Sequence, residues 1–189
     1  GHWNLIAQDA VQNHGLSLID SARTFALLNI GVADSAIACW DNKFTYDFWR
    51  PVTAIREDGL DPDPSWTSLV VTPPFPSYTS GHSTFSGAAS EILTYLFGDD
   101  YHFDASQEGD PSIVRSFTSF YHAANEAAES RLFGGIHFRF DNYDGLVGGL
   151  ALGDYVSRNF LSPVPEPTSF VLIFTICLGF ALRRFRIVS

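Results

Sequence analysis

Hydrophobic residues recur at helical spacing over most of the chain. Behind Ser17, apolar residues repeat every three or four positions as far as about Asn42, as they do along one face of a helix. Ser17 and Asp20 resemble a capping box in which Asp replaces the usual Glu or Gln. The pattern therefore predicts a long helix from Ser17 to about Asn42, preceded by a shorter helix around residues 3–13.

The second half of the chain predicts three more helices. Residues 57–79 are rich in Pro, Asp, Ser and Thr, which indicates a long loop. Alternation with a period of two is not sustained anywhere, so no strand is predicted and the fold class is all-α, a helical bundle. The last helix is glycine-rich, and its glycines would let a neighbouring helix approach closely. The three helices are expected from near Ser80 to Gly98, from about Ser119 to Phe133, and from about Asp141 to Phe160, with the glycines at Gly145, Gly148, Gly149 and Gly153.

Composition and charge exclude several classes of protein. The chain has 189 residues, of which 46% are hydrophobic, so it is long and apolar enough for one folded domain rather than a disordered segment. A net charge of −10 argues against a nucleic-acid partner, and two cysteines exclude a disulfide framework. The chain contains no methionine and opens like the interior of a helix, so we expect it to be the C-terminal part of a longer protein.

The end of the chain forms a separate module. Body residues 1–161 are followed by a Pro-rich linker at 162–169 and by an apolar segment with an arginine cluster at 170–189. The 13 uncharged residues from Phe170 to Leu182 are short for a membrane span of ~20 residues, and a buried C-terminal helix is the alternative. The order Pro-Glu-Pro, apolar stretch, arginines resembles a PEP-CTERM sorting signal. That resemblance implies an exported protein, at the periplasm, cell surface or exterior of a Gram-negative bacterium, whose tail an exosortase handles and which meets the membrane only transiently.

Three clusters of residues carry the candidate chemistry. They supply two guanidinium groups, one ammonium, a hydroxyl, two imidazoles, and the backbone N–H groups of a predicted helix start. Arginine and lysine bind tetrahedral oxyanions such as phosphate, and helix N-termini favour anions. If the local geometry is helical, Asp141 lies one turn beyond His137 and could orient its ring. The clusters are Lys43-x6-Arg50-Pro51, Ser80-Gly81-His82 and Ser130-Arg131-x5-His137-x3-Asp141.

In this order, the three clusters resemble the signature shared by vanadium-dependent haloperoxidases and type 2 phosphatidic acid phosphatases. One departure is Thr79, which stands where the family usually has proline. Trp40, three residues before the lysine, and the Phe-Pro-x-Tyr motif beginning at Phe75 resemble the chloroperoxidase-like branch. The likeness runs from about Trp3 to Phe160. It implies the helical bundle of that superfamily without its N-terminal half.

The resemblance also implies a role for each motif residue. Vanadate would be the cofactor, bonded axially to His137, with hydrogen peroxide and halide as substrates and hypohalous acid as product. His82 would be the acid–base group, while Trp40 and Phe75 would border a halide pocket unless they simply pack in the core. The residues implied to neutralise or hydrogen-bond the oxyanion are Lys43, Arg50, Ser80, Gly81 and Arg131.

Two alternatives remain open at this point. Phosphate can occupy the same site, and a phosphatase acting on a phosphomonoester would use His137 as the nucleophile of a phosphohistidine intermediate. The other alternative is a non-catalytic exported surface protein that keeps an oxyanion-binding site.

Overall fold

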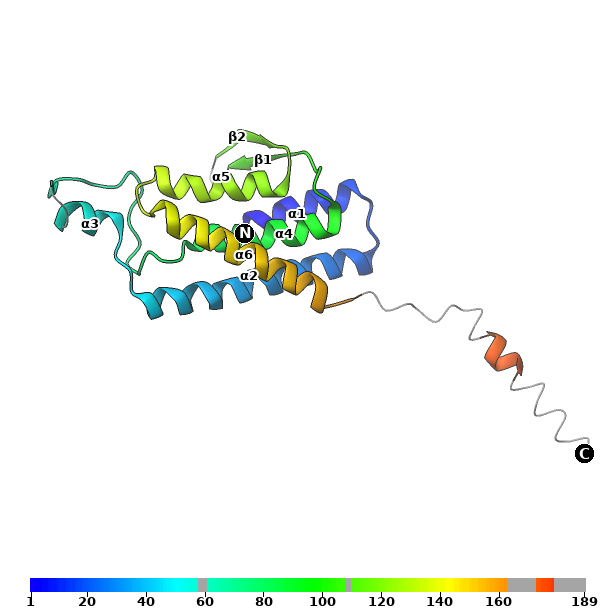
Figure 1. Cartoon of the computed structure of the whole chain (residues 1–189). Helices are drawn as coiled ribbons and strands as arrows, with labels where there is room; N and C mark the ends of the chain where they lie inside the picture. The colour runs from blue at the N-terminus through cyan, green and yellow to red at the C-terminus, as the bar shows by residue number, and fades with distance from the viewer. Residues whose placement is uncertain (58–60, 108–109, 163–172, 179–189) are drawn as a thin grey trace, which may run out of the picture.

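The structure is a computed structural model that describes residues 1–57, 61–107, 110–162 and 173–178. The described part of the chain is mostly helical, which confirms the predicted all-α fold class (Figure 1). The predicted linker at 162–169 lies outside the described residues except for Ser162, and the predicted sorting signal lies outside them except for 173–178. In chain order, the elements are α1 (His2–Asn13), α2 (Leu18–Tyr46), α3 (Pro51–Glu57), α4 (Gly81–Phe97), β1 (Phe103–Gln107), β2 (Asp110–Phe117), α5 (Phe120–Phe133) and α6 (Arg139–Asn159).

The predicted start of the long helix is confirmed in atomic detail. Ser17 is the N-cap of α2, and its hydroxyl oxygen accepts the backbone N–H of Asp20 at 3.1 Å. The same hydroxyl donates to the Asp20 carboxylate at 2.6 Å, so Asp does replace the usual Glu or Gln of a capping box. The helix continues past Asn42 to Tyr46 and ends where Asp47 adopts a left-handed conformation with φ 43°. This extra turn carries Lys43.

The structure adds two elements that the sequence did not predict. Helix α3 has only seven residues, too few for an apolar repeat, and Pro51 occupies its first position, where a missing N–H does no harm. Strands β1 and β2 form an antiparallel hairpin in which Phe103 pairs with Phe117. Strand β2 is exposed at every position before Phe117, so it lacks the apolar alternation that identifies a half-buried strand. The expectation that there would be no strand was therefore wrong.

Helix α4 occupies the centre of the bundle. It packs against α6, α5 and α2, while the hairpin lies beyond α5, on the side away from α2 (Figure 1). Helix α2 is long and apolar enough to qualify as a candidate membrane span by length and composition, but Leu27 and Leu28 on one of its faces are fully buried in the core. The main core cluster comprises Ile6, Ala7, Ala10, Leu28, Ala89, Leu93 and Phe120, and a smaller one comprises Leu27, Ile92 and Val156.

Glycines on α6 set its distance from α4. A Cβ atom added at Gly149 would lie 2.2 Å from the carbonyl oxygen of Thr84. Cβ atoms at Gly145 and Gly153 would lie 2.8 Å from the carbonyl of Ser80, the N-cap of α4, and 2.6 Å from that of Ala88. The predicted close approach is thus confirmed at three positions. It is wrong for Gly148, which is exposed and has nothing within 4 Å of an added Cβ. Close contact between α4 and α6 holds the beginnings of both helices together, and the candidate site is there.

We expect Gly149→Ala to lower the free energy of unfolding by about 3 kcal/mol, because the added methyl group must push α4 away from α6. The matched control is Gly148→Ala on the same helix, which should leave the protein as stable or raise its stability by up to ~1 kcal/mol through helix propensity. Urea denaturation of both variants measures the difference. Equal effects of the two substitutions would contradict this account of the interface.

Candidate functional site

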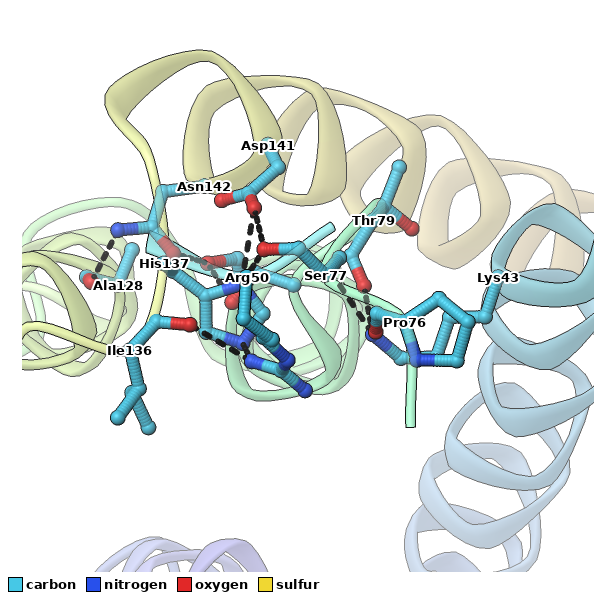
Figure 2. A network of polar contacts seen from close by, with 12 residues as sticks. Lys43, Arg50, Pro76, Ser77, Thr79, Ala128, Ile136, His137, Asp141 and Asn142 are labelled. Atoms are coloured by element: carbon cyan, nitrogen blue, oxygen red, sulfur yellow. Dashed lines mark hydrogen bonds and ion pairs between the residues drawn. The ribbon is translucent and has the colours of Figure 1, made fainter. Parts of the chain in front are cut away.

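The candidate site forms where three segments meet: the end of α2, the loop before α4, and the start of α6 (Figure 2). Lys43 lies in the last turn of α2, and Arg50 directly precedes α3. His137 comes two residues before α6, and Asp141 lies in the first turn of that helix. The structure therefore brings together residues from all three of the predicted clusters.

Lys43 is fully buried and anchors the loop before α4. Its ammonium group donates to the carbonyl oxygens of Pro76 and Ser77, each at 2.9 Å, and to that of Thr79 at 2.6 Å (Figure 2). Burial lowers the pKa of Lys43 to about 8, so the group is still predominantly a cation at neutral pH. Its three N–H bonds are thus committed to the loop. Lys43 adds positive charge to the site and at the same time fixes the shape of the loop.

Arg50 links the loop to the segment before α6. Its Nε donates to the Phe75 carbonyl at 2.9 Å, and its Nη1 donates to the Ile136 carbonyl at 2.7 Å. Nη1 also lies 3.0 Å from Nε2 of His137. The remaining nitrogen, Nη2, is buried and has no hydrogen-bond partner among the described residues. A buried guanidinium nitrogen without an acceptor is costly, and an anion at this point would satisfy it.

The ring of His137 is held between a cation and a carboxylate. Its Nδ1 lies 3.1 Å from Oδ2 of Asp141, and its Nε2 faces Arg50. Because a guanidinium group only donates, Nε2 must accept, which places the proton of the neutral ring on Nδ1. Burial lowers the pKa of His137, although Asp141 partly opposes this effect. His137 thus presents a neutral nitrogen lone pair, the form needed for a metal ligand or a nucleophile.

The start of α4 supplies backbone donors beside these side chains. Ser80 is the buried N-cap residue, and its N–H donates to the Asp141 carbonyl at 3.0 Å, which ties α4 to α6. The Ser80 hydroxyl does not cap the helix; it accepts from the hydroxyl of Ser83 at 3.0 Å. The first N–H groups of a helix, from Gly81 onward here, have no intrahelical acceptor, and the helix dipole favours an anion beside them.

His82 and Arg131 lie on the accessible side of the site. Both line a cavity of about 430 Å³ whose other lining residues come from α1, α4, α5 and the hairpin. Lys43, Arg50 and His137 are buried and are not among its lining residues. The His82 side chain is exposed to solvent on one side, and its pKa is lowered, chiefly by partial desolvation and next by the positive charge of Arg131. At neutral pH, His82 is therefore an uncharged base at the entrance.

Trp40 and Phe75 lie side by side next to the buried lysine. Their ring centroids are 5.3 Å apart, and both side chains are half-buried. The Lys43 ammonium is 5.2 Å from the Phe75 ring centroid and 5.8 Å from that of Trp40. The two rings therefore form an aromatic wall at the cationic end of the site.

Sequence reasoning missed two buried polar residues in this region. Ser77 donates its hydroxyl proton to Oδ2 of Asp141, and its Oγ is 3.3 Å from Nδ1 of His137. Asn142 donates to the carbonyl of Ala128 on α5 and accepts from Ser83 on α4, so it joins three helices. The sequence offered only weak signals for them. Ser77 occupies the variable position of the Phe-Pro-x-Tyr motif, and Asn142 directly follows Asp141.

The chain is similar to proteins of known family and structure. Residues 23–165 match the family model described as the VCPO second helical-bundle domain. The chain is 30% identical to the vanadium chloroperoxidase of Curvularia inaequalis, with 71% of this chain and 30% of that protein covered. It also resembles the crystal structure of a bacterial vanadium-dependent iodoperoxidase, with a TM-score of 0.80, 41% identity, and 87% of this chain and 40% of that one covered.

A holo-type bacterial vanadium-dependent chloroperoxidase shares the fold, with a TM-score of 0.68 and 21% identity over 82% of this chain and 39% of that one. The chain thus spans less than half the length of each of these relatives.

We expect phosphate binding to weaken about tenfold as the pH rises through about 8, because the Lys43 ammonium, whose pKa is lowered to about 8, then loses its charge. Phosphate itself becomes more fully the dianion over this range, which alone would strengthen binding, so a loss of affinity can be assigned to the protein. Isothermal titration calorimetry between pH 7 and 9 measures the effect, with Lys43→Gln as the control that should bind weakly at every pH. An affinity of the unaltered protein that stays constant over this range would contradict the prediction.

Proposed function

The chain belongs to the vanadium haloperoxidase family, and on that premise we propose that it forms the vanadate-binding part of an enzyme that oxidises halide with hydrogen peroxide to hypohalous acid. The observation that carries this proposal is the neutral Nε2 of His137 beside the buried, unpartnered Nη2 of Arg50. The lone pair of His137 can bond to the central atom of an oxyanion, and the unpartnered N–H of Arg50 can donate a hydrogen bond to one of its oxygens. The two groups together therefore suit vanadate.

The donor set fits vanadate. His137 would hold vanadate through Nε2, and the buried cations Lys43 and Arg50 would balance the negative charge. Ser80 and the amide of Gly81, at the N-terminus of α4, would hydrogen-bond the oxyanion, with Arg131 closing the site from α5. Bound vanadate would supply a Lewis acid that activates hydrogen peroxide toward halide without itself changing oxidation state.

The protein's own residues would accept a proton, border the halide and keep water away from the histidine ring. His82 is uncharged at neutral pH and lines the cavity, so it would accept a proton from hydrogen peroxide as the peroxide enters. Trp40 and Phe75 would border the halide, whose charge the adjacent Lys43 ammonium attracts. Burial of His137 and Asp141 keeps water away from the hydrogen bond that orients the ring.

A phosphatase is the second candidate, because the same lone pair on His137 could attack a phosphomonoester. In that reaction, His82 would have to protonate the leaving alcohol. The lowered pKa of His82 leaves it without a proton to give at neutral pH, so phosphatase activity would be confined to acidic solution. The same property leaves the His82 ring uncharged at neutral pH, the state in which it can accept a proton.

The experiment uses the protein cleared of metal and phosphate and reloaded with orthovanadate. We expect peroxide-dependent oxidation of iodide and bromide, and we include iodide because the relative with 41% identity is an iodoperoxidase. His137→Ala should lower the vanadate-dependent activity at least a thousandfold, because the side chain that would hold vanadate is lost. The matched control is His102→Ala, which removes an exposed histidine paired with Asp100 and should leave the rate unchanged.

Other outcomes would redirect the assignment. Hydrolysis of an aryl phosphate that vanadate inhibits, without halide oxidation, would identify a phosphatase. Tight binding of phosphate or vanadate without turnover of either kind would favour the alternative of a non-catalytic protein that keeps an oxyanion-binding site.

We also propose that the protein is exported from a Gram-negative bacterium and that an exosortase removes its C-terminal tail. The support is the order of the Pro-Glu-Pro linker, the apolar segment and the arginine cluster from 164 to 186. Intact-mass spectrometry of the protein isolated from its native host should show a chain that lacks the arginine cluster and Cys177. An exported protein that keeps residues 170–189 would contradict the proposal.

A further inference from the structure

Ser77 is a buried serine whose hydroxyl lies between the carboxylate of Asp141 and the ring of His137. All three side chains are buried, with exposed fractions of 0%, 0% and 5% respectively. The Ser77 hydroxyl donates to Oδ2 of Asp141, and the same oxygen lies 3.3 Å from Nδ1 of His137 (Figure 2). None of the three sequence clusters contains Ser77.

The direction of each hydrogen bond follows from the chemistry of the partners. A carboxylate only accepts, so the single Ser77 proton points to Asp141, and a lone pair of Ser77 is left facing His137. Nδ1 of His137 therefore meets two acceptors, Oδ2 of Asp141 at 3.1 Å and Oγ of Ser77 at 3.3 Å. Both contacts favour the ring tautomer with its proton on Nδ1, as does Arg50 on the opposite nitrogen.

Asp141 depends on Ser77 for its orientation. Its other oxygen, Oδ1, is buried and has no partner among the described residues, so Oδ2 makes the only side-chain hydrogen bonds of the carboxylate there. Without the hydroxyl of Ser77, the carboxylate would keep one donor, His137, and would be free to rotate about its Cβ–Cγ bond.

The backbone of Ser77 is fixed on both sides. Its N–H donates to the carbonyl of Phe48 at 2.8 Å, and its carbonyl accepts the ammonium of Lys43 at 2.9 Å. The hydroxyl is therefore presented from a rigid point, which is what a side chain that orients another group requires.

We propose that Ser77 is a positioning residue that clamps the carboxylate of Asp141 against His137, so that Nε2 of His137 stays unprotonated and faces the oxyanion. The use of that lone pair for vanadate rests on the proposed function. The clamp itself is a property of the protein without any ligand. Outer hydrogen-bond partners of a ligating histidine commonly change ligand affinity by about 10- to 100-fold when they are removed.

The direct test is nitrogen NMR of His137 in the vanadate-free protein. We expect Nδ1 to give the shift of a protonated ring nitrogen and Nε2 that of an unprotonated one. In Ser77→Ala, the two shifts should move toward each other as the other tautomer gains population. Ser77→Cys, which nearly preserves volume and donates only weakly, should change the shifts in the same direction and guards against a folding failure of the alanine variant.

Binding of orthovanadate supplies the second readout. We expect Ser77→Ala to weaken binding about tenfold. The matched control is Ser90→Ala, a buried serine on α4 whose hydroxyl bonds the Gly87 carbonyl; it should change binding less than twofold. Because Ser77 acts through Asp141, Ser77→Ala should have little further effect in an Asp141→Asn background, so the two substitutions should be strongly non-additive.

The outcomes separate the clamp from the proposed function. Unchanged His137 shifts in both Ser77 variants, or additive effects of Ser77→Ala and Asp141→Asn on binding, would overturn the inference. Altered shifts in a protein that binds no vanadate even without substitution would support the clamp and overturn the proposed cofactor.

Discussion

The site depends first on one buried ammonium group. Lys43 lies buried in the last turn of α2, and three carbonyl oxygens of the loop at 76–79 accept hydrogen bonds from it. A buried cation without partners would be strongly destabilising, so the loop and the lysine require each other. The shape that the loop takes around Lys43 then sets where Ser77 presents its hydroxyl and where Ser80 begins α4. Positions that are far apart in the sequence thus become a single unit through one side chain.

Charge balance explains why this region suits an anion although the whole chain carries a net charge of −10. Within the described ranges, the buried ionic groups are Lys43 and Arg50 as cations, Asp141 as the only buried carboxylate, and His137, which burial keeps neutral. Two cations against one carboxylate leave an excess of positive charge in a region of low dielectric constant. Numerous surface carboxylates do not cancel this excess, because solvent screens them. Net charge therefore describes the surface of this protein and not its interior.

The sequence predicted what is periodic or is carried by motifs. The long helix as far as Asn42, the cap at Ser17 and the close approach at Gly149 all followed from spacing and local chemistry, whereas the further turn that carries Lys43 did not. The hairpin did not, because β2 has no buried face before Phe117, and a strand exposed on both sides carries no hydrophobic signal. The sequence also did not predict the role of Ser77, because that role comes from tertiary contacts with residues about sixty positions away. The order of the motifs indicated which residues lie close together. Only the structure shows that all three N–H groups of Lys43 donate to carbonyl oxygens of the loop.

The contact between Arg50 and Nε2 of His137 has a consequence for the thermodynamics of the site. In the structure this lone pair accepts a hydrogen bond from the Arg50 guanidinium at 3.0 Å. An oxyanion that bonds Nε2 must therefore replace Arg50 as its partner. The Arg50 guanidinium can then donate a hydrogen bond to the oxyanion itself. The free energy of binding is then the difference between the interactions of the bound oxyanion and the Arg50–His137 contact that it replaces. The measured affinity therefore depends on both. The two residues are therefore coupled, because an oxyanion that bonds Nε2 must also satisfy the guanidinium that it replaces.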